Sequence, residues 1–395
     1  MINRENLLEA AQFESLEGDA VSFYFQPGTP QNNSHRGETI HVKDLVRTAL
    51  HEAERNGNHR GVRDDLQRIL VLAESMQSRK PGRRIAKVVF ACAKNGFWRE
   101  YDIPMRSECG SLTVKRQFHL RPLTAVVDEF PRVCIALVGR TTVRLCELWM
   151  GEIRETEKSV SKLPRRSRSD GFLGYDAGHA ERHIDHEAIH HFKRFADRLQ
   201  RKQEKEGFER LIVGCRDETW PEIEPRLHPS VRQRLVGRFS FDASTGTVDQ
   251  VREQVELILK TYRQKRYHEL LQRVMDEAKG NGLGALGIKR VLRSLEAGEA
   301  QTLLLGDNFA APAAECQNCG HVEPLKTGIQ CPICGANTRV IEDVSDFLLG
   351  AAFRKGIEVV PVPPGPDFEK IGNIAALLRF RADHNRNVAL KQQAG

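Results

Sequence analysis

Four cysteines in the C-terminal third of the chain have the spacing of ligands for one metal ion. They form two C-x-x-C pairs, Cys316 with Cys319 and Cys331 with Cys334, and a glycine follows each pair. Four thiolates at this separation hold one zinc ion tetrahedrally, and because no coordination position is left open, such a site is structural and not catalytic. The alternatives are a pair of disulfides or four unrelated thiols. The sequence therefore predicts a zinc ribbon over residues 314–338, with structural Zn2+ as its cofactor.

A second metal-binding pattern, H-E-x-x-H, is formed by His186, Glu187 and His190. On a helix, two histidines four residues apart can hold one zinc ion while the glutamate acts as a base, as in zinc metallopeptidases. The surrounding segment is rich in histidine, however, and no third ligand stands out downstream. Three interpretations stay open: a peptidase site, an incidental or regulatory metal site, and a solvated or RNA-facing helix surface.

The composition is ordinary for a soluble globular protein of two or three domains. The chain has 395 residues, of which 40% are hydrophobic and 29% charged. It has no apolar run of membrane-spanning length and no signal-peptide core, and its five other cysteines are scattered, which predicts reduced thiols and a cytoplasmic location. A net charge of +7 favours a polyanionic partner only mildly. A basic group at His59, Arg60 and Arg63 is either solvated or contacts phosphate.

Hydrophobic periodicity predicts alternating helices and strands that would position these residues. The N-terminal part is residues 1–130, with expected helices over 1–20, 44–54 and 63–76 and strands over 21–25, 85–92, 99–104 and 112–122. The central part is residues 131–258, with strands over 132–138, 141–148 and 151–158, an irregular glycine- and arginine-rich loop over 163–179, a long helix over 180–205, a strand over 210–215, a helix over 222–235 and a short strand over 239–242.

The C-terminal part, residues 259–395, is expected to form an α/β/α layer. A long helix over 247–279 leads into it, followed by a helix ending at residue 297, a strand over 301–305, the ribbon, a helix over 341–353, a strand over 358–362 and a helix over 371–380. The polar tail after residue 380 is expected to fray. The fold class is thus α/β, with three α/β domains and a zinc ribbon inserted in the last one.

This order of domains resembles the archaeo-eukaryotic peptide-chain release factor and Pelota superfamily. The likeness covers nearly the whole chain, and its most specific part runs from Gly282-Leu-Gly-Ala-Leu-Gly-Ile288 through the ribbon to Ile371-Gly-Asn-Ile-Ala-Ala-Leu-Leu-Arg-Phe380. An early strand, Val21-Ser-Phe-Tyr-Phe25, agrees with it. The loop over 163–179 is similar to the bacterial branch of the superfamily, which includes ribosome hibernation factors of the Balon type.

The resemblance implies a binding factor without catalytic residues. Release factors of this family carry a Gly-Gly-Gln motif in the loop before the central long helix, where it positions a water molecule against the peptidyl-tRNA ester. Residues 163–179 contain no Gly-Gly-Gln, and the N-terminal part lacks the stop-codon motifs Asn-Ile-Lys-Ser and Tyr-x-Cys-x-x-x-Phe. Removing an oriented catalytic group costs on the order of several kcal/mol of transition-state stabilisation. The implied role is a plug that occupies the ribosomal A site and protects idle ribosomes.

The resemblance also implies where ribosomal RNA and protein partners bind. Arginines can contact RNA phosphates and aromatic rings can stack on bases. The expected rRNA-binding residues are Arg165, Arg166, Arg168, Gly171, Phe172, Gly174, Tyr175, Gly178, Arg182 and His183, together with Arg60 and Arg63. A disordered loop that contacts nothing is the alternative. The implied protein partner is a translational GTPase, elongation factor Tu; the free protein is expected to be monomeric, without membrane contact. Two alternative functions stay open: a release or rescue factor using another loop residue, and a zinc metallopeptidase.

Overall fold

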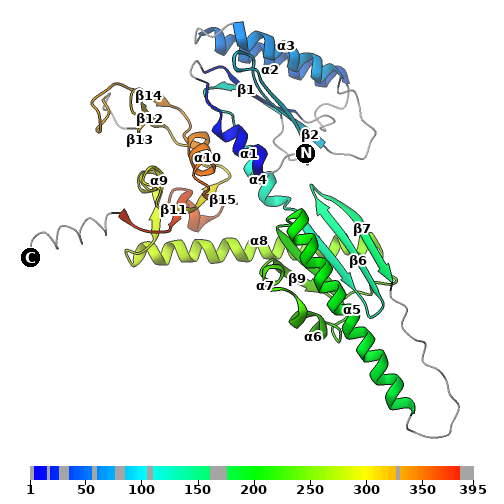
Figure 1. Ribbon diagram of the computed structural model, residues 1–395. Helices are drawn as coiled ribbons and strands as arrows, with labels where there is room; N and C mark the ends of the chain where they lie inside the picture. Colours follow the sequence, from blue (N-terminus) through cyan, green and yellow to red (C-terminus); the bar gives the residue numbers. More distant parts are fainter. Residues whose placement is uncertain are drawn as a thin grey trace, which may run out of the picture. The chain divides into compact units, whose positions relative to one another are not determined.

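The computed structural model shows a mixed α/β protein (Figure 1). It describes residues 4–15, 18–25, 35–55, 60–75, 85–104, 110–160, 176–325 and 330–382. Contacts divide the chain into two compact units: unit 1 comprises residues 1–129 and 267–395, and unit 2 comprises residues 130–266. The three-domain division stays a prediction. None of the described helices is both long enough and apolar enough to cross a membrane.

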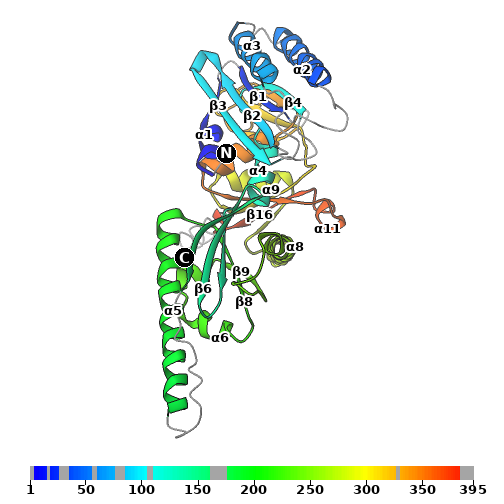
Figure 2. The same ribbon diagram turned by 90° about the vertical axis from the view of Figure 1, so that its right-hand side faces the viewer.

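The N-terminal part of unit 1 is built on a four-stranded antiparallel sheet in the order β3-β2-β1-β4. Its strands are β1 (Ala20–Phe25), β2 (Ile85–Cys92), β3 (Phe97–Pro104) and β4 (Gly110–Lys115). Helices α2 (His35–Arg55) and α3 (Arg60–Ser75) pack on one face (Figure 2). α3 folds as predicted because Val62, Leu66 and Ile69 recur at helical spacing and meet Phe23 and Val89 of the sheet.

Three of the expected N-terminal elements differ from the structure. Helix α2 begins at His35, nine residues before its predicted start at residue 44. The first helix, α1, spans only Arg4–Gln12 and does not reach residue 20, where β1 begins. The strand expected over 112–122 ends at Lys115, and α4 (Arg121–Glu129) follows. Pro122 does not end a strand here, because proline is also tolerated in the first turn of a helix, where its missing N–H would have no partner.

Two carboxyl groups and a thiol are buried together in this part of unit 1. The side chain of Asp65 accepts a hydrogen bond from the Ala93 N–H at 2.7 Å, and the Cys92 thiol donates to Asp19 at 3.4 Å. One oxygen of each aspartate is buried without a hydrogen-bond partner among the described residues. Burial, together with the charge of Asp19, raises the pKa of Asp65 to about 6.

The substitution Asp65→Asn is expected to stabilise the protein at neutral pH. The folded-state pKa of about 6 lies above the ordinary value of 3.8, so the free energy of unfolding falls as pH rises through this interval. Asparagine keeps an acceptor for Ala93 without a charge, and we expect a gain of about 1–2 kcal/mol at pH 7.5 that vanishes below pH 4. Urea unfolding at both pH values measures it. Asp64→Asn, on the exposed neighbour, should change little; equal stabilities of Asp65→Asn and the parent protein at pH 7.5 would contradict the explanation.

The C-terminal part of unit 1 has a second four-stranded sheet in the order β10-β16-β11-β15. Its strands are β10 (Gly284–Leu286), β11 (Ala300–Gly306), β15 (Glu358–Val362) and β16 (Ile374–Leu378). β11 and β15 are parallel, and β16 runs antiparallel to both of its neighbours. The helix predicted over 371–380 is therefore wrong, because Ile374–Leu378 is a fully buried central strand. A strand buried on both faces is a continuous apolar run, which does not differ from a buried helix in periodicity.

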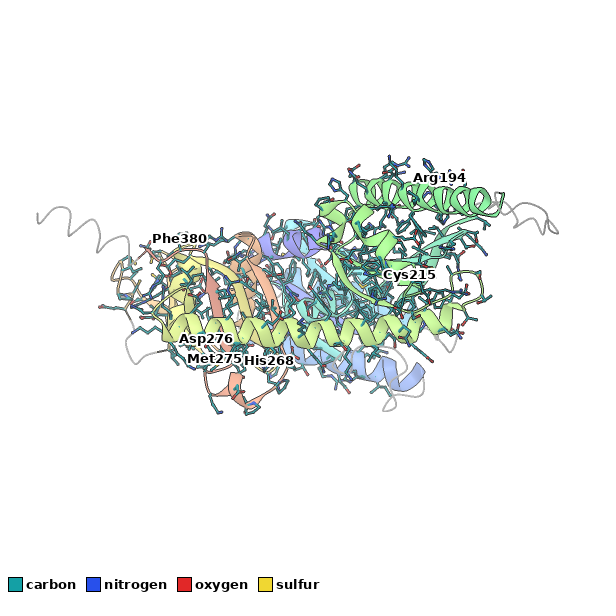
Figure 3. All side chains as sticks on the ribbon, turned by 90° about the horizontal axis from the view of Figure 1, so that it is seen from below. Arg194, Cys215, His268, Met275, Asp276 and Phe380 are labelled. Atoms are coloured by element: carbon teal, nitrogen blue, oxygen red, sulfur yellow. The ribbon has the colours of Figure 1, made fainter. Side chains whose placement is uncertain are left out.

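Helices cover both faces of this sheet, as expected for an α/β/α layer. On one face lie α9 (Gly287–Glu296) and α10 (Ser345–Arg354), which contribute Leu292 and Leu348 to the core. On the other lie α11 (Pro366–Glu369) and the C-terminal half of α8 (Val248–Lys279), through Phe368 and Val274. His268, Met275 and Asp276 mark this half of α8 in Figure 3. The predicted helix over 341–353 thus begins four residues later, at Ser345.

Asp346, in the first turn of α10, joins the first and last parts of the chain within unit 1. Its carboxylate is 5% exposed. It accepts the Leu120 N–H at 3.2 Å, lies 2.9 Å from His119 Nδ1 and 3.1 Å from Lys115 Nζ. Burial alone would raise the pKa of Asp346, but the hydrogen bonds and charges of His119 and Lys115 hold it below its ordinary value. Nearby, α1 packs along α10, and Arg354 donates to the Ala11 carbonyl at 2.8 Å.

Unit 2 contains a five-stranded sheet in the order β7-β6-β5-β8-β9. Its strands are β5 (Val133–Val138), β6 (Thr142–Trp149), β7 (Glu152–Val160), β8 (Arg210–Cys215) and β9 (Leu235–Phe239). β5, β6 and β7 form the predicted antiparallel meander, and β5, β8 and β9 are parallel. The helix predicted over 222–235 is wrong. Prolines 221, 225 and 229 restrict this segment to the short turns α6 (Trp220–Ile223), η2 (Glu224–Arg226) and α7 (Pro229–Arg232).

Two long helices sandwich this sheet. Helix α5 (Asp176–Glu206) begins four residues before its predicted start and packs Phe192, Phe195 and Leu199 on one face, while the N-terminal half of α8 packs on the other. In Figure 3, Arg194 lies on the outward side of α5 and Cys215 lies within the unit. Burial raises the pKa of Cys215 to about 11, so this thiol is protonated and inert, as expected for a structural cysteine.

Candidate functional site

The four predicted cysteine ligands converge in a three-stranded antiparallel ribbon inserted after β11. The ribbon consists of β12 (Ala313–Cys316), β13 (Val322–Pro324) and β14 (Thr338–Ile341), in the order β13-β12-β14. The four sulfur atoms lie within 4.8 Å of one another. Cys316 and Cys334 have their sulfurs 3.4 Å apart, and those of Cys319 and Cys331 are 3.6 Å apart.

These sulfur separations distinguish between the interpretations left open by the sequence. A Zn–S bond of about 2.3 Å places two sulfurs of a tetrahedral site about 3.8 Å apart, whereas a disulfide requires about 2.0 Å. The observed 3.4–3.6 Å is close to the tetrahedral value and far from a covalent bond. Because Cys316 and Cys331 are buried while Cys319 and Cys334 are exposed, the cluster opens toward the surface on one side.

Backbone N–H groups point at two of the four sulfurs. The N–H groups of Asn318 and Cys319 each point at the Cys316 sulfur at 3.4 Å, and the Ile333 N–H points at Cys331 at the same distance. The Cys319 N–H in particular lowers the pKa of Cys316 to about 6. Such N–H groups stabilise thiolates and orient them toward a metal. Gly320 and Gly335 close the two turns in the left-handed conformation, φ 69° and 72°, which glycine adopts without strain.

Two contacts to one carboxylate, from a side chain and from a backbone N–H, attach the cysteine cluster to the body of unit 1. His321, directly after the first knuckle, has Nδ1 2.8 Å from a carboxylate oxygen of Glu296 at the end of α9. The same carboxylate accepts the Val322 N–H at 3.0 Å. Ala313 and Val322 then join the apolar core shared by α9 and α10. Folding of the ribbon is therefore coupled to the part of unit 1 that contains α9.

The second metal-binding pattern lies on α5, as the sequence predicted, but its geometry is only partly described. Glu187 is half-buried and His190 is exposed, whereas the side chain of His186 lies outside the described residues. Within the described part of the chain, the four cysteines are the one group of three or more potential metal ligands. Any metal site that includes His186 lies outside the described residues.

His191, the last histidine of this segment, has a structural role. It is 4% exposed and hydrogen-bonds to the backbone of Gly139, in the turn after β5. Burial, with the nearby charges of Arg194 and Arg198, lowers the pKa of His191. A neutral, buried imidazole held by a backbone group positions the helix on the sheet, so the histidine-rich segment is not a uniform polar surface.

Most of the predicted RNA-binding residues lie where the structure gives no side-chain geometry. The loop residues Arg165, Arg166, Arg168, Gly171, Phe172, Gly174 and Tyr175 lie outside the described residues. Gly178, Arg182 and His183 belong to α5, and Arg60 is the first residue of α3, but their side chains are not described; Arg63 is exposed on α3. RNA binding by all of these residues stays a prediction.

The outward face of α5 carries a line of cations that were not among the predicted site residues. Arg194, Arg198, Arg201 and Lys205 follow one another at intervals of four, three and four residues, so they share one side of the helix. Counting residues at helical spacing along the predicted helix over 180–205 would have identified this basic stripe from the sequence.

Comparison with known proteins finds that the chain is similar to peptide-chain release factors. A model of the bacterial archaeo-eukaryotic release factor family 10 matches residues 119–258. Peptide chain release factor subunit 1 of Thermococcus sibiricus is 29% identical over 294 residues, which cover 66% of this chain and 69% of that protein. The same factor from Pyrococcus abyssi is 27% identical over 294 residues, 66% of this chain and 70% of that protein.

Among solved structures, a model of ribosome-bound archaeal Pelota and ABCE1 covers 96% of this chain and 94% of that chain, with 14% identity and a TM-score of 0.42. The family assignment rests on the sequence matches, which include the whole segment from the end of the N-terminal sheet to the start of α8. These matches support the predicted membership of the chain in the archaeo-eukaryotic peptide-chain release factor and Pelota superfamily.

Proposed function

We propose that this protein binds the ribosome as a non-hydrolysing occupant of the A site and protects idle ribosomes as a hibernation factor. One observation carries the proposal. The chain is similar to release factors, but its loop over 163–179 lacks their Gly-Gly-Gln tripeptide. Without an oriented glutamine and the flexible backbone beside it, the loop has no group to position water against an ester. The loop keeps Arg165, Arg166 and Arg168, which suit RNA phosphates.

The architecture of unit 2 supports a binding role for this loop. The loop leaves the sheet at the end of β7 and re-enters the fold at Asp176, the first residue of α5. Figure 1 shows α5 extending past the end of the sheet, and among the side chains that the structure describes, the first that packs in the core is that of Ala188. We infer that a rigid helix packed on the sheet at its C-terminal part provides a stable support for a binding segment that precedes it.

We also propose that the four-cysteine ribbon holds structural Zn2+, and that a translational GTPase accompanies the protein to the ribosome. The sulfur separations and the N–H groups around the cluster support the metal. The family resemblance supports a GTPase, for which elongation factor Tu is the candidate. A pull-down of the intact protein with elongation factor Tu in its GTP and GDP forms tests this partner; equal lack of binding in both forms would remove it.

Replacing Arg165, Arg166 and Arg168 together by alanine is expected to weaken ribosome binding about tenfold or more. For every phosphate that is no longer neutralised, the slope of log affinity against log salt should also fall by about 0.7–0.9. Co-sedimentation with ribosomes across a salt series measures both quantities. A variant with Lys289, Arg293 and Lys370 changed to alanine removes three exposed cations of unit 1 and should bind normally. Loop and control variants that bind alike would remove the loop from the mechanism.

A peptidyl-tRNA hydrolysis assay distinguishes the plug from a release or rescue factor. We expect the bound protein to leave the ester intact over times in which a release factor would complete many turnovers. Hydrolysis that the loop substitutions abolish would instead establish a release activity through a different residue of the loop.

A further inference from the structure

A groove of about 460 Å³ runs between the edge strand β7 and the C-terminal half of α5. It lies about five helical turns from the loop that the proposed function uses, since α5 has about 3.6 residues per turn. The side chains that line it are Thr156, Glu157, Arg198, Arg201, Lys202, Lys205 and Glu206. Four of these seven are cations and none is apolar, so the groove is a charged surface and not an unfilled part of the core.

The two carboxylates of the groove are already engaged. Glu157 forms an ion pair with Arg198 at 2.9 Å, and Glu206 forms one with Lys202 at 2.6 Å and a second with Arg132 at 3.5 Å. These pairs hold the acids against the walls of the groove. The positive charge that remains belongs to residues that the acids do not reach.

The remaining cations lie on the exposed side of the C-terminal half of α5. Arg201 and Lys205 line the groove, and Arg194 lies two turns before Arg201 on the same side of the helix. All three are exposed and form no ion pair with the described residues. Arg194 and Lys205 are separated by about 17 Å along the helix, with Arg201 between them. An array of this length matches an extended chain of anions better than a single small anion.

We propose that this groove is a second RNA-binding surface, in which the basic face of α5 contacts consecutive phosphates of an RNA strand. The inference rests on the proposed function in that RNA is the partner, and it adds a site that is independent of the loop over 163–179. A protein partner fits less well, because the groove offers no apolar or aromatic anchor. Alternating charges along β7, from Glu152 to Lys158, also disfavour pairing of this edge strand with another strand.

The test compares two sets of substitutions in the full-length protein. Arg194→Ala, Arg201→Ala and Lys205→Ala together should lower the affinity for a short RNA duplex of random sequence about tenfold or more at low salt, and reduce the salt slope by about two. The variant with Lys289, Arg293 and Lys370 changed to alanine is the matched control. Fluorescence anisotropy measures duplex binding, and circular dichroism confirms that both variants are folded.

The outcomes separate the groove from the proposed function. Loss of duplex binding in the α5 variant alone supports the groove, even if the parent protein ignores ribosomes and the proposed function fails. Equal duplex binding by the α5 variant and the control contradicts RNA binding in the groove, whether or not the protein binds ribosomes. A parent protein that does not bind the duplex at low salt overturns it as well. If the groove acts on the ribosome, the α5 and loop substitutions should weaken co-sedimentation additively, since the two sites have no residue in common.

Discussion

Asp346→Ala is expected to lower the free energy of unfolding of unit 1 by about 3–5 kcal/mol. The substitution removes the acceptor of the Leu120 N–H and the partner of His119 and Lys115. Because this carboxylate is 5% exposed, water cannot replace it without opening the contact between α10 and the end of the N-terminal sheet. Chemical denaturation of the full-length protein, followed by circular dichroism, measures the change.

An exposed ion pair of the same unit provides the control. Asp367 lies 3.0 Å from Lys370, and both side chains are more than 60% exposed. Asp367→Ala is therefore expected to cost less than about 1 kcal/mol. If Asp346→Ala and Asp367→Ala lowered the free energy of unfolding by similar amounts, Asp346 would not be a stabilising contact between the N-terminal and C-terminal parts of unit 1.

The contribution of Asp346 should also depend on pH in a defined direction. The pKa of Asp346 lies below its ordinary value of 3.8, so the ionised form is favoured in the folded protein. Its stabilising effect is complete above that value and disappears as pH falls through the folded-state pKa. The difference in stability between the parent protein and Asp346→Asn should therefore shrink below pH 4.

Removal of one thiolate from the ribbon is expected to reduce bound zinc from one ion per chain to nearly none. Structural zinc sites bind with apparent free energies of about 10–16 kcal/mol at pH 7, which depend on the complete set of ligands. Cys319→Ser leaves three sulfurs and should also expose the ribbon to proteolysis, since Val322 is then no longer held in the core of α9 and α10. Mass spectrometry of metal content after dialysis against a mild chelator measures the first effect.

A buried cysteine outside the ribbon provides the control for metal content. Cys215→Ala in unit 2 creates a small cavity but should leave the zinc content unchanged, because this thiol lies in the core of the other unit. A Cys319→Ser protein that retains a full equivalent of zinc would contradict the four-sulfur site, as would a parent protein that binds none.

The cysteine cluster was predictable from the sequence because its geometry is local. Two pairs of ligands, each within a single turn, fix the position of the sulfurs wherever the ribbon lies in the fold. The Asp346 contact was not predictable, because His119 and Asp346 are 227 residues apart and neither belongs to a recognisable pattern. Only the packing of α10 against the N-terminal part brings them together.

The misassigned elements have a similar explanation. Ile374–Leu378 contains alanine and leucine, which are good helix formers, and tertiary burial between two strands overrides that preference. Conversely, α3 and the packed part of α5 were predicted correctly because a helix with one buried face retains its period in the sequence. Elements exposed on one side were therefore predicted more reliably than elements buried on both.

The separation in sequence between His119 and Asp346 also determines how late unit 1 can finish folding during synthesis of the chain. Helix α1 is made before α10, but its buried residues Leu7, Ala10 and Ala11 include a face that packs on α10. At about 5–20 residues per second, the 227 residues from His119 to Asp346 alone take roughly 10–45 s to translate. During that interval the nascent chain presents an uncovered apolar helix, and we expect a chaperone to shield it until the last third of the polypeptide emerges.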